Sequence, residues 1–145
     1  MCINYFYKKK YGISKPENTK EITHDELYFL LYDKFKCNVL ELSDRKYEIA
    51  PKSEYRRFLK YDDTDRYVYT SDWFDCDDYS VHLHGNITIP YWSRLAFGEI
   101  WVHTGKGGHA LNLFVDSEYK IWLVEPQNDK IFEMPDDWDA YRIEI

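Results

Sequence analysis

The chain has 145 residues, of which 44% are hydrophobic and 19% aromatic, so it is too apolar to be disordered and long enough for one substantial core. Its net charge of −7 argues against a nucleic acid held through its phosphates and against an anionic membrane surface. We therefore expect a single globular domain over residues 1–145 with neither kind of partner.

Targeting signals and paired cysteines are not expected. The N-terminal segment has no long apolar run and no small-residue cleavage site, and no apolar run approaches the roughly 20 residues that span a membrane. Cys2, Cys37 and Cys76 are odd in number and widely separated, which argues against a disulfide framework and a zinc knuckle. These features predict a cytoplasmic protein with reduced thiols.

The first half of the chain is predicted to be mainly helical. Thr23 and Glu26 form a capping-box pattern at the start of a helix over residues 23–36, whose apolar face carries Leu27, Leu30, Leu31 and Phe35. Pro51 can open a second helix with the sequence PKSEYRRFLKY. Short strands are expected over residues 38–42, 47–49 and 66–70.

A third helix begins in the segment DCDDYS. Asp75 can act as its N-cap, which places Cys76 at the first helical position, and Gly85 supplies a stop. The rest of the chain has strand patterns over residues 99–102, 109–115, 120–125, 130–134 and 141–145. Helices followed by an antiparallel sheet predict an α+β fold.

The chemistry of Cys76 is ambiguous from its own segment. A thiol at a helix N-terminus faces backbone N–H groups, which lower its pKa, but the carboxylates of Asp75, Asp77 and Asp78 oppose a thiolate. These aspartates could also supply oxygens to Ca²⁺, although they lack the spacing and the glycine of an EF-hand. A buried structural thiol, a metal ligand and a nucleophile all stay open.

A hairpin later in the chain supplies a possible partner for this thiol. Folding the chain about Ser117 brings His109 almost opposite Glu125. A loop of three or five residues would place both side chains on one face, whereas an even loop would separate them unless a bulge intervenes. If they meet, Glu125 can orient the imidazole and His109 can activate Cys76; the alternative is an ordinary hairpin that happens to carry both.

Read in order, DCDDYS, GHALN and EPQ resemble a known family. They are similar to the motifs of the papain-like cysteine protease domain at the C-terminus of the fairy-ring-mushroom agglutinin and of its single-domain bacterial and phage relatives, over roughly residues 20–135. The resemblance implies a papain-like fold in which the nucleophile stands at a helix N-terminus packed against the sheet.

The resemblance also implies roles for individual residues. Cys76 would be the nucleophile, His109 the base and Glu125 the orienting acid, with Asn112 and Gln127 in supporting positions of the motifs. The family's activity depends on calcium, which implies a Ca²⁺ site carried by Asp77 and Asp78. A chain of 145 residues has no room for the agglutinin's sugar-binding half, so no carbohydrate partner is implied.

The resulting hypothesis is a calcium-dependent cysteine peptidase that cleaves an amide bond of a protein or peptide substrate through a thioester on Cys76. A transamidase or deamidase would use the same three residues. The alternative from another class is a binding module that keeps the fold without turnover.

Overall fold

The structure is a computed structural model that describes residues 2–145, with side chains from Asn4 onward. Its helices are α1 (Cys2–Tyr11), α2 (His24–Phe35), α3 (Lys52–Tyr61) and α4 (Cys76–Ile87), with short 3₁₀ turns η1 (Thr64–Arg66) and η2 (Trp92–Arg94). Its strands are β1 (Lys20–Thr23), β2 (Val39–Glu41), β3 (Lys46–Ile49), β4 (Phe97–Thr104), β5 (Gly107–Val115), β6 (Ile121–Glu125), β7 (Lys130–Phe132) and β8 (Asp139–Glu144).

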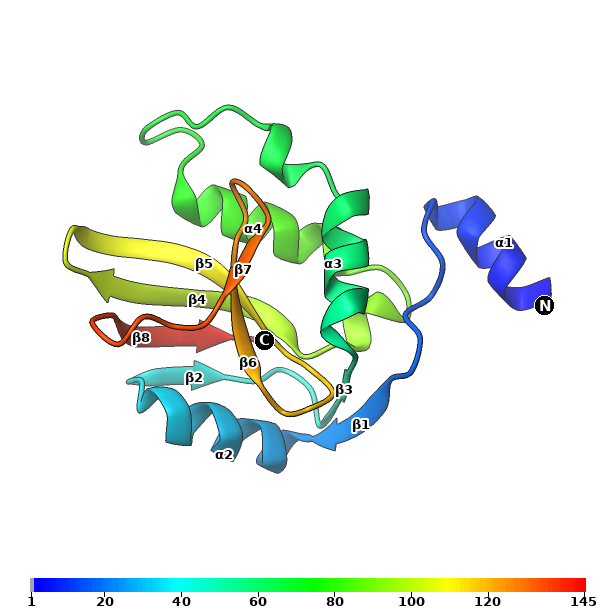
Figure 1. The fold of residues 1–145 in the computed structure, drawn as a ribbon, viewed down its shortest axis with the longest axis horizontal. Coiled ribbons are helices and arrows are strands. Elements are labelled where there is room, and N and C mark those ends of the chain that lie inside the picture. Colours follow the sequence, from blue (N-terminus) through cyan, green and yellow to red (C-terminus); the bar gives the residue numbers. More distant parts are fainter. Residues whose placement is uncertain (1) are drawn as a thin grey trace.

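A six-stranded sheet in the order β2-β8-β4-β5-β6-β7 forms the centre of the molecule (Figure 1). Its neighbouring strands are antiparallel except β2 and β8, which run parallel, and β1 pairs with β3 in a separate two-stranded sheet. The α+β class predicted from the sequence is confirmed, whereas the expectation of a wholly antiparallel sheet fails at this edge. Strand β2 comes before α3 and α4, and it joins the sheet beside β8, the last strand of the chain. The two strands are not joined by a hairpin turn, so they can run parallel.

Strand alternation divides the core between the two faces of this sheet. Leu111 and Leu113 of β5 pack in one cluster with Leu27, Leu31 and Phe35 of α2. Phe114, on the opposite side of the same strand, packs in a second cluster with side chains of α3 and α4. Successive strand residues point to opposite faces, so the odd positions of β5 face α2 and the even positions face α4.

The capping box predicted for α2 is present. The N–H of Glu26 donates to Thr23 Oγ1 at 3.3 Å, and the N–H of Thr23 donates to Glu26 Oε2 at 2.8 Å. Lys36 closes the helix in the left-handed conformation, with φ of 49°. The capping-box pattern in the sequence therefore predicted correctly where this helix begins.

Several elements differ from the predictions, among them strand β1, which was not expected. Residues 66–70 form no strand, because Tyr67, Val68 and Tyr69 are exposed and this segment is a loop that folds back on itself through a bridge between Thr70 and Phe74. Helix α4 passes Gly85 and ends at Ile87, since burial of Ile87 in the core stabilises another half-turn.

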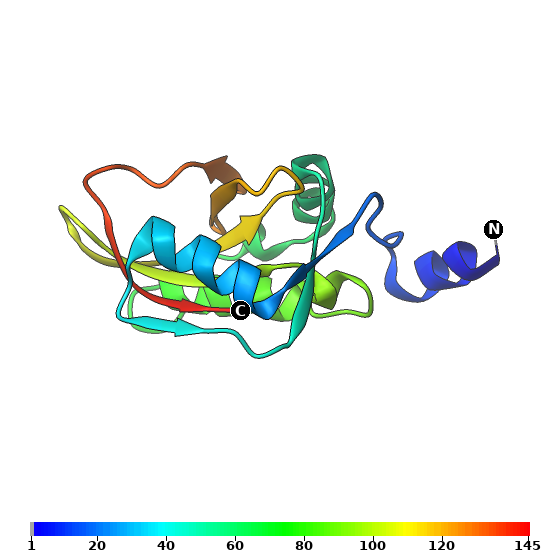
Figure 2. The ribbon, with the colours of Figure 1, turned by 90° about the horizontal axis from the view of Figure 1, so that it is seen from below.

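Helix α1 was not predicted and projects from the body of the molecule (Figures 1 and 2). Tyr7 is its buried contact, whereas Tyr5 and Phe6 are each 66% exposed. None of the helices within residues 2–145 combines the length and apolarity needed to cross a bilayer. The thiol of Cys2 lies outside the described side chains; Cys37 and Cys76 are both free.

An acidic cluster lies where the turn between β6 and β7 meets the end of α3. The buried carboxylate of Asp62 accepts hydrogen bonds from the Thr64 N–H at 2.8 Å and the Asn86 amide at 2.7 Å. Asp129 has a buried Oδ1 without a hydrogen-bond partner in the described part of the chain. Burial, and then the charges of Asp65 and Asp62, raise the pKa of Asp129 to about 7.

Two glycines give opposite predictions for the same substitution. A Cβ on Gly98 would lie 2.1 Å from the main-chain oxygen of Glu144, so Gly98→Ala must force β4 and β8 apart. We expect it to lower the free energy of unfolding by about 3 kcal/mol or more. Gly85 lies exposed in α4 with nothing within 4 Å of an added Cβ, so Gly85→Ala should raise it by about 0.5–1 kcal/mol. Urea unfolding measures both, and equal effects would contradict the close approach at Gly98.

The raised pKa of Asp129 predicts a pH-dependent stability. An aspartate titrates near ~3.9 in the unfolded chain, so the folded state binds the proton more tightly and loses stability as pH rises from there to about 7. Asp129→Asn should therefore raise the Tm relative to the parent at about pH 8 and leave it unchanged near pH 3.5. The exposed Asp136→Asn is the matched control, with no such pH-dependent gain. Thermal unfolding at both pH values checks this.

Candidate functional site

Helix α4 places Cys76 at its first position, as predicted. Asp75 is the N-cap residue, and its N–H donates to the carboxylate of Asp78 at 3.1 Å. The N–H of Asp72 donates in turn to Asp75 Oδ2 at 3.3 Å, which ties the preceding loop to the helix start. The half-buried thiol of Cys76 is thus held among acidic side chains whose positions are determined by the cap.

Three of these side chains form a compact cluster. A carboxylate oxygen of Asp75, the sulfur of Cys76 and a carboxylate oxygen of Asp77 lie within 4.8 Å of one another. Interaction with the side chain of Asp77 lowers the pKa of the Asp75 carboxyl, and the reciprocal interaction raises the pKa of Asp77. Two carboxyl groups this close favour one shared proton or a cation between them. Asp78, expected beside Asp77 as a metal ligand, lies outside this cluster of three and accepts the Asp75 N–H in the helix cap.

The hairpin that carries His109 and Glu125 has an odd number of loop residues, which places both side chains on one face of the sheet. Asp116 and Lys120 close the turn through a 2.9 Å hydrogen bond, which leaves the odd loop of three residues, 117–119. Val115 pairs with Ile121, so the register continues with Leu111 opposite Glu125. His109 is two residues from Leu111 and shares its face, which makes His109 and Glu125 diagonal neighbours.

These two side chains are in contact. His109 Nε2 lies 2.8 Å from Glu125 Oε2, and both side chains are largely buried. The N–H of Gln127 donates to Glu125 Oε1 at 3.3 Å, so the turn after β6 helps to hold the carboxylate. The ring of Trp138 approaches His109 edge to face at 6.3 Å. The imidazole is therefore oriented by an acid, a backbone-held turn and an aromatic wall.

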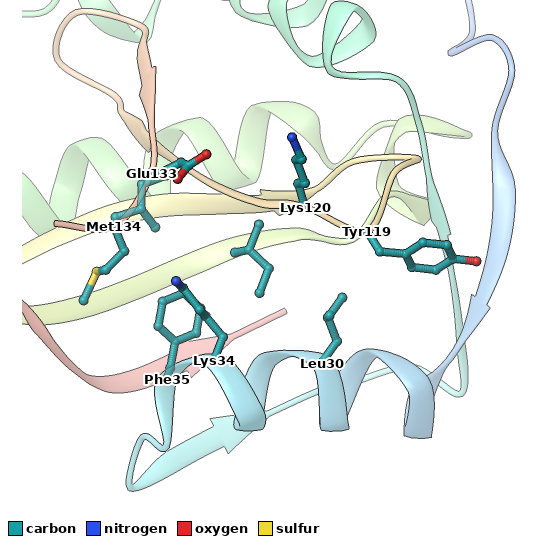
Figure 3. A pocket seen from close by; sticks show the side chains of 9 residues that line it. Leu30, Lys34, Phe35, Tyr119, Lys120, Glu133 and Met134 are labelled. Carbon is teal, nitrogen blue, oxygen red and sulfur yellow. The ribbon is translucent and has the colours of Figure 1, made fainter. Parts of the chain in front are cut away.

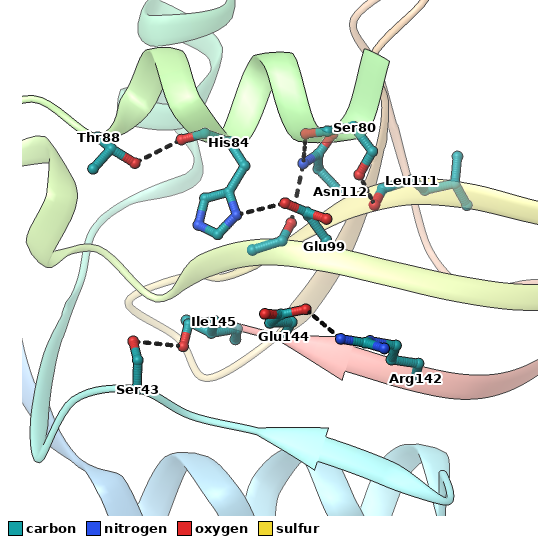
Figure 4. A network of polar contacts seen from close by, with 11 residues as sticks. Ser43, Ser80, His84, Thr88, Glu99, Leu111, Asn112, Arg142, Glu144 and Ile145 are labelled. Atoms are coloured by element: carbon teal, nitrogen blue, oxygen red, sulfur yellow. Dashed lines mark hydrogen bonds and ion pairs between the residues drawn. The ribbon is translucent and has the colours of Figure 1, made fainter. Parts of the chain in front are cut away.

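Asn112 joins α4 to the sheet (Figure 4). Its side chain is fully buried, and Nδ2 donates to the carbonyl of Ser80 at 2.9 Å and to that of Gly98 at 3.2 Å. Ser80 Oγ donates to the Leu111 carbonyl at 2.7 Å. Ser80 is one helical turn after Cys76, so these bonds determine where the start of α4 sits along β5.

A second pair continues this junction along α4. His84 Nδ1 lies 2.9 Å from Glu99 Oε1, one turn beyond Ser80 (Figure 4). Glu99 is opposite Asn112 in the ladder between β4 and β5, so both polar side chains of the sheet face the helix. This pair was not predicted from the sequence. Glu99 is two positions from the apolar residues Phe97 and Trp101 of its strand, and an acidic residue on the same side of a strand as apolar ones is a signal that it has a partner.

The structure does not link the two halves of the predicted triad directly. Within the described side chains, no hydrogen bond connects the Cys76 thiol with His109 or Glu125. Strand alternation explains this, because His109 shares the face of Leu111, which packs under α2, whereas α4 packs on the side of Asn112. His109–Glu125 and Asp75–Cys76–Asp77 are thus two polar clusters, one on a strand and one on a helix start.

An exposed aromatic loop, missed from the sequence, precedes the cysteine. Tyr67 and Tyr69 are 49% and 51% exposed, and Trp73 is 85% exposed. Burial, and then the negative charge of the adjoining helix start, chiefly on Asp75, raises the pKa of Tyr69. We call residues 67–74 the aromatic loop. Large exposed rings that have nothing to cover them are a feature of binding surfaces.

Comparison with known proteins finds the fold but no family. No protein-family model and no curated protein match the sequence. A structure described as a PSL1a–E64 complex superimposes with a TM-score of 0.77 at 20% identity, covering 86% of this chain and 50% of the other. Polyporus squamosus lectin bound to the human-type influenza-binding epitope Neu5Acα2-6Galβ1-4GlcNAc gives 0.74 at 20% identity, covering 86% and 49%. The chain spans about half the length of each, and the likeness establishes a shared fold.

These findings correct the family and the activity expected from the motifs. The fold is found in a lectin, and no protease family model matches, so membership of the agglutinin C-terminal protease family is not retained. The predictions of a cysteine peptidase and of an enzyme are corrected with it. The expectation that carbohydrate is no partner is corrected as well. The alternative of a binding module with the same fold is the hypothesis that fits.

Proposed function

We propose that this domain is a carbohydrate-binding module that uses its α+β fold, with a cysteine-bearing helix start packed on a sheet, as a scaffold for a ligand site. The site consists of the aromatic loop and the adjoining Asp75–Cys76–Asp77 cluster. The observation that carries the proposal is the exposure of three aromatic rings directly before a set of hydrogen-bonding carboxylates. Support from the comparisons comes from a neighbour of the same fold that is bound to a glycan epitope.

The aromatic loop offers the apolar half of a sugar site. One face of a pyranose ring carries C–H groups that stack on an aromatic ring, and Trp73 and Tyr69 present such rings to solvent. Tyrosine and tryptophan give a large contact area at a low cost in conformational entropy. Tyr67 is held in place by Phe74 and His82, whose rings lie 5.1 Å and 4.8 Å away, so part of the loop is preorganised.

The carboxylates offer the polar half. Sugar hydroxyls donate hydrogen bonds to carboxylate oxygens, and Asp75 and Asp77 lie within 4.8 Å of each other beside the loop. The same acidic character disfavours an anionic sugar unless a cation intervenes. In this proposal His109 and Glu125, supported by Gln127, line the neighbouring end of the sheet, whereas Asn112 positions α4 from within the core.

The donor set partly fits the calcium implied by the motif resemblance. Asp75 and Asp77 supply hard oxygens, and the shared interaction that raises the pKa of Asp77 is one that a divalent cation would replace. The Asp78 carboxylate already accepts the Asp75 N–H, and a thiol is a poor ligand for Ca²⁺. Asp75 and Asp77 would therefore hold the ion, with the remaining oxygens supplied by water or by sugar hydroxyls.

A glycan titration with matched variants tests the proposal. A glycan array, followed by calorimetry on its best ligand and on Neu5Acα2-6Galβ1-4GlcNAc, is performed with Ca²⁺ and with chelator. We expect saturable binding. Trp73→Ala should weaken it roughly tenfold or more, as for an aromatic anchor that the ligand covers. Asp77→Asn should weaken it in the presence of Ca²⁺. Phe29→Ala removes another exposed aromatic ring, on α2, and should leave binding unchanged.

The role of the thiol separates binding from turnover. Cys76→Ala should bind the glycan nearly as the parent does, since in this proposal the sugar is contacted by the aromatic rings and the carboxylates and not by the thiol. Both proteins are also incubated with a peptide library and analysed by mass spectrometry. Cleavage by the parent that disappears in Cys76→Ala would contradict a module without turnover, and the absence of saturable binding across the array would contradict its carbohydrate ligand.

A further inference from the structure

A groove is formed by α2, β6 and the segment after β7 (Figure 3). Helix α2 lies on the opposite side of the sheet from α4 and the aromatic loop that precedes it (Figure 1). Its volume is about 270 Å³, just below the usual range of small-molecule sites. Leu30 and Phe35 of α2 form one wall, and Ile121 and Met134 contribute from the other side. These side chains pack against the core cluster beneath α2, so the apolar floor is continuous with the core and is held rigidly.

The rim of this groove is positively charged. Lys34 projects from α2 and Lys120 from the turn between β5 and β6, on opposite walls of the groove (Figure 3). Both are exposed, and neither forms an ion pair with any side chain that the structure describes. Lys20 adds a third cation at the same end, with its Nζ 4.2 Å from the centre of the Tyr119 ring. Glu133 is the acid among the lining residues.

This charge is unusual for the molecule. The chain has a net charge of −7, yet its apolar groove is bordered by lysines. An exposed lysine beside apolar surface is also explained by solubility alone, and Lys34 lies in the last turn of α2, where a cation favours the helix dipole. The helix dipole does not account for Lys120, which belongs to a turn and lines the same groove.

The dimensions narrow the ligand class. A volume of about 270 Å³ suits a short aliphatic chain better than a drug-sized molecule or a long-chain lipid. We propose that the groove binds a medium-chain aliphatic carboxylate, with its tail along Leu30, Ile121 and Met134 and its carboxylate at the rim that carries Lys34 and Lys120. This site is independent of the proposed glycan site.

Decanoate, kept below the concentration at which it forms micelles, is the probe. Titration of ¹⁵N-labelled protein should give saturable shifts of the amide signals of Leu30, Ile121 and Met134. Decyltrimethylammonium, which has the same tail and the opposite charge, and butanoate, which has the same head group and a short tail, should both bind more weakly. Equal binding of either control, or shifts that do not saturate, would overturn the proposal.

Two double variants, which change the net charge of the protein by the same amount, test whether the position of the lysines matters. Lys34→Gln with Lys120→Gln should weaken decanoate binding roughly three- to tenfold, as expected for two exposed ion pairs. Lys9→Gln with Lys106→Gln removes two exposed lysines outside the groove and should leave the affinity unchanged. Because all four side chains are exposed, the variants keep the fold. Equal losses in the two double variants would reduce the effect to net charge and overturn the assignment.

Discussion

The side-chain amide of Asn112 is the interaction on which the arrangement of both clusters depends. It is fully buried and bonds simultaneously to a carbonyl of α4 and to a carbonyl of β4, so it connects helix and sheet across the core. Its Oδ1 has no partner among the described residues, which makes its burial costly unless both donor bonds are kept. A buried amide with this cost specifies one register of α4 on the sheet, where apolar contacts alone would tolerate sliding.

Two consequences follow from that register. The helix start, with Asp75, Cys76 and Asp77, is placed toward the same end of the molecule as the aromatic loop that precedes it. The hairpin of β5 and β6 is built on the same strand as Asn112, so the pair of His109 and Glu125 is positioned by the ladder that positions the amide. The helix and the hairpin are therefore both positioned by β5, the strand that carries Asn112. Neither cluster is connected to the core through a flexible segment.

The local parts of this arrangement were predictable from sequence because their causes are local. The capping box of Thr23 and Glu26 and the cap of Asp75 depend on residues three positions apart. The contact of His109 with Glu125 depended only on the number of residues in one turn, which sequence left open between odd and even and which the structure gives as three. The general α+β order followed from the same patterns.

The other features depend on contacts between distant segments. The parallel pairing of β2 with β8 joins residues about a hundred positions apart, and no local pattern encodes it. Residues 66–70 alternate as a strand does but find no sheet edge, so their rings stay in solvent. The motif resemblance identified residues that form two polar clusters, but it could not establish what the domain does with them.

Charge separates the two proposed sites as clearly as distance does. The helix start and its loop gather carboxylates, including a pair whose mutual interaction shifts both pKa values in opposite directions, whereas the groove under α2 is bordered by lysines without ion pairs in the described chain. At physiological salt, exposed charges act over only about 8 Å, so the acidic end does not cancel the field at the groove. A cation or a polyhydroxylated ligand is favoured at one end and a small apolar anion at the other, and the same molecule can hold both because α2 and α4 lie on opposite faces of the sheet and salt screens the charges between them.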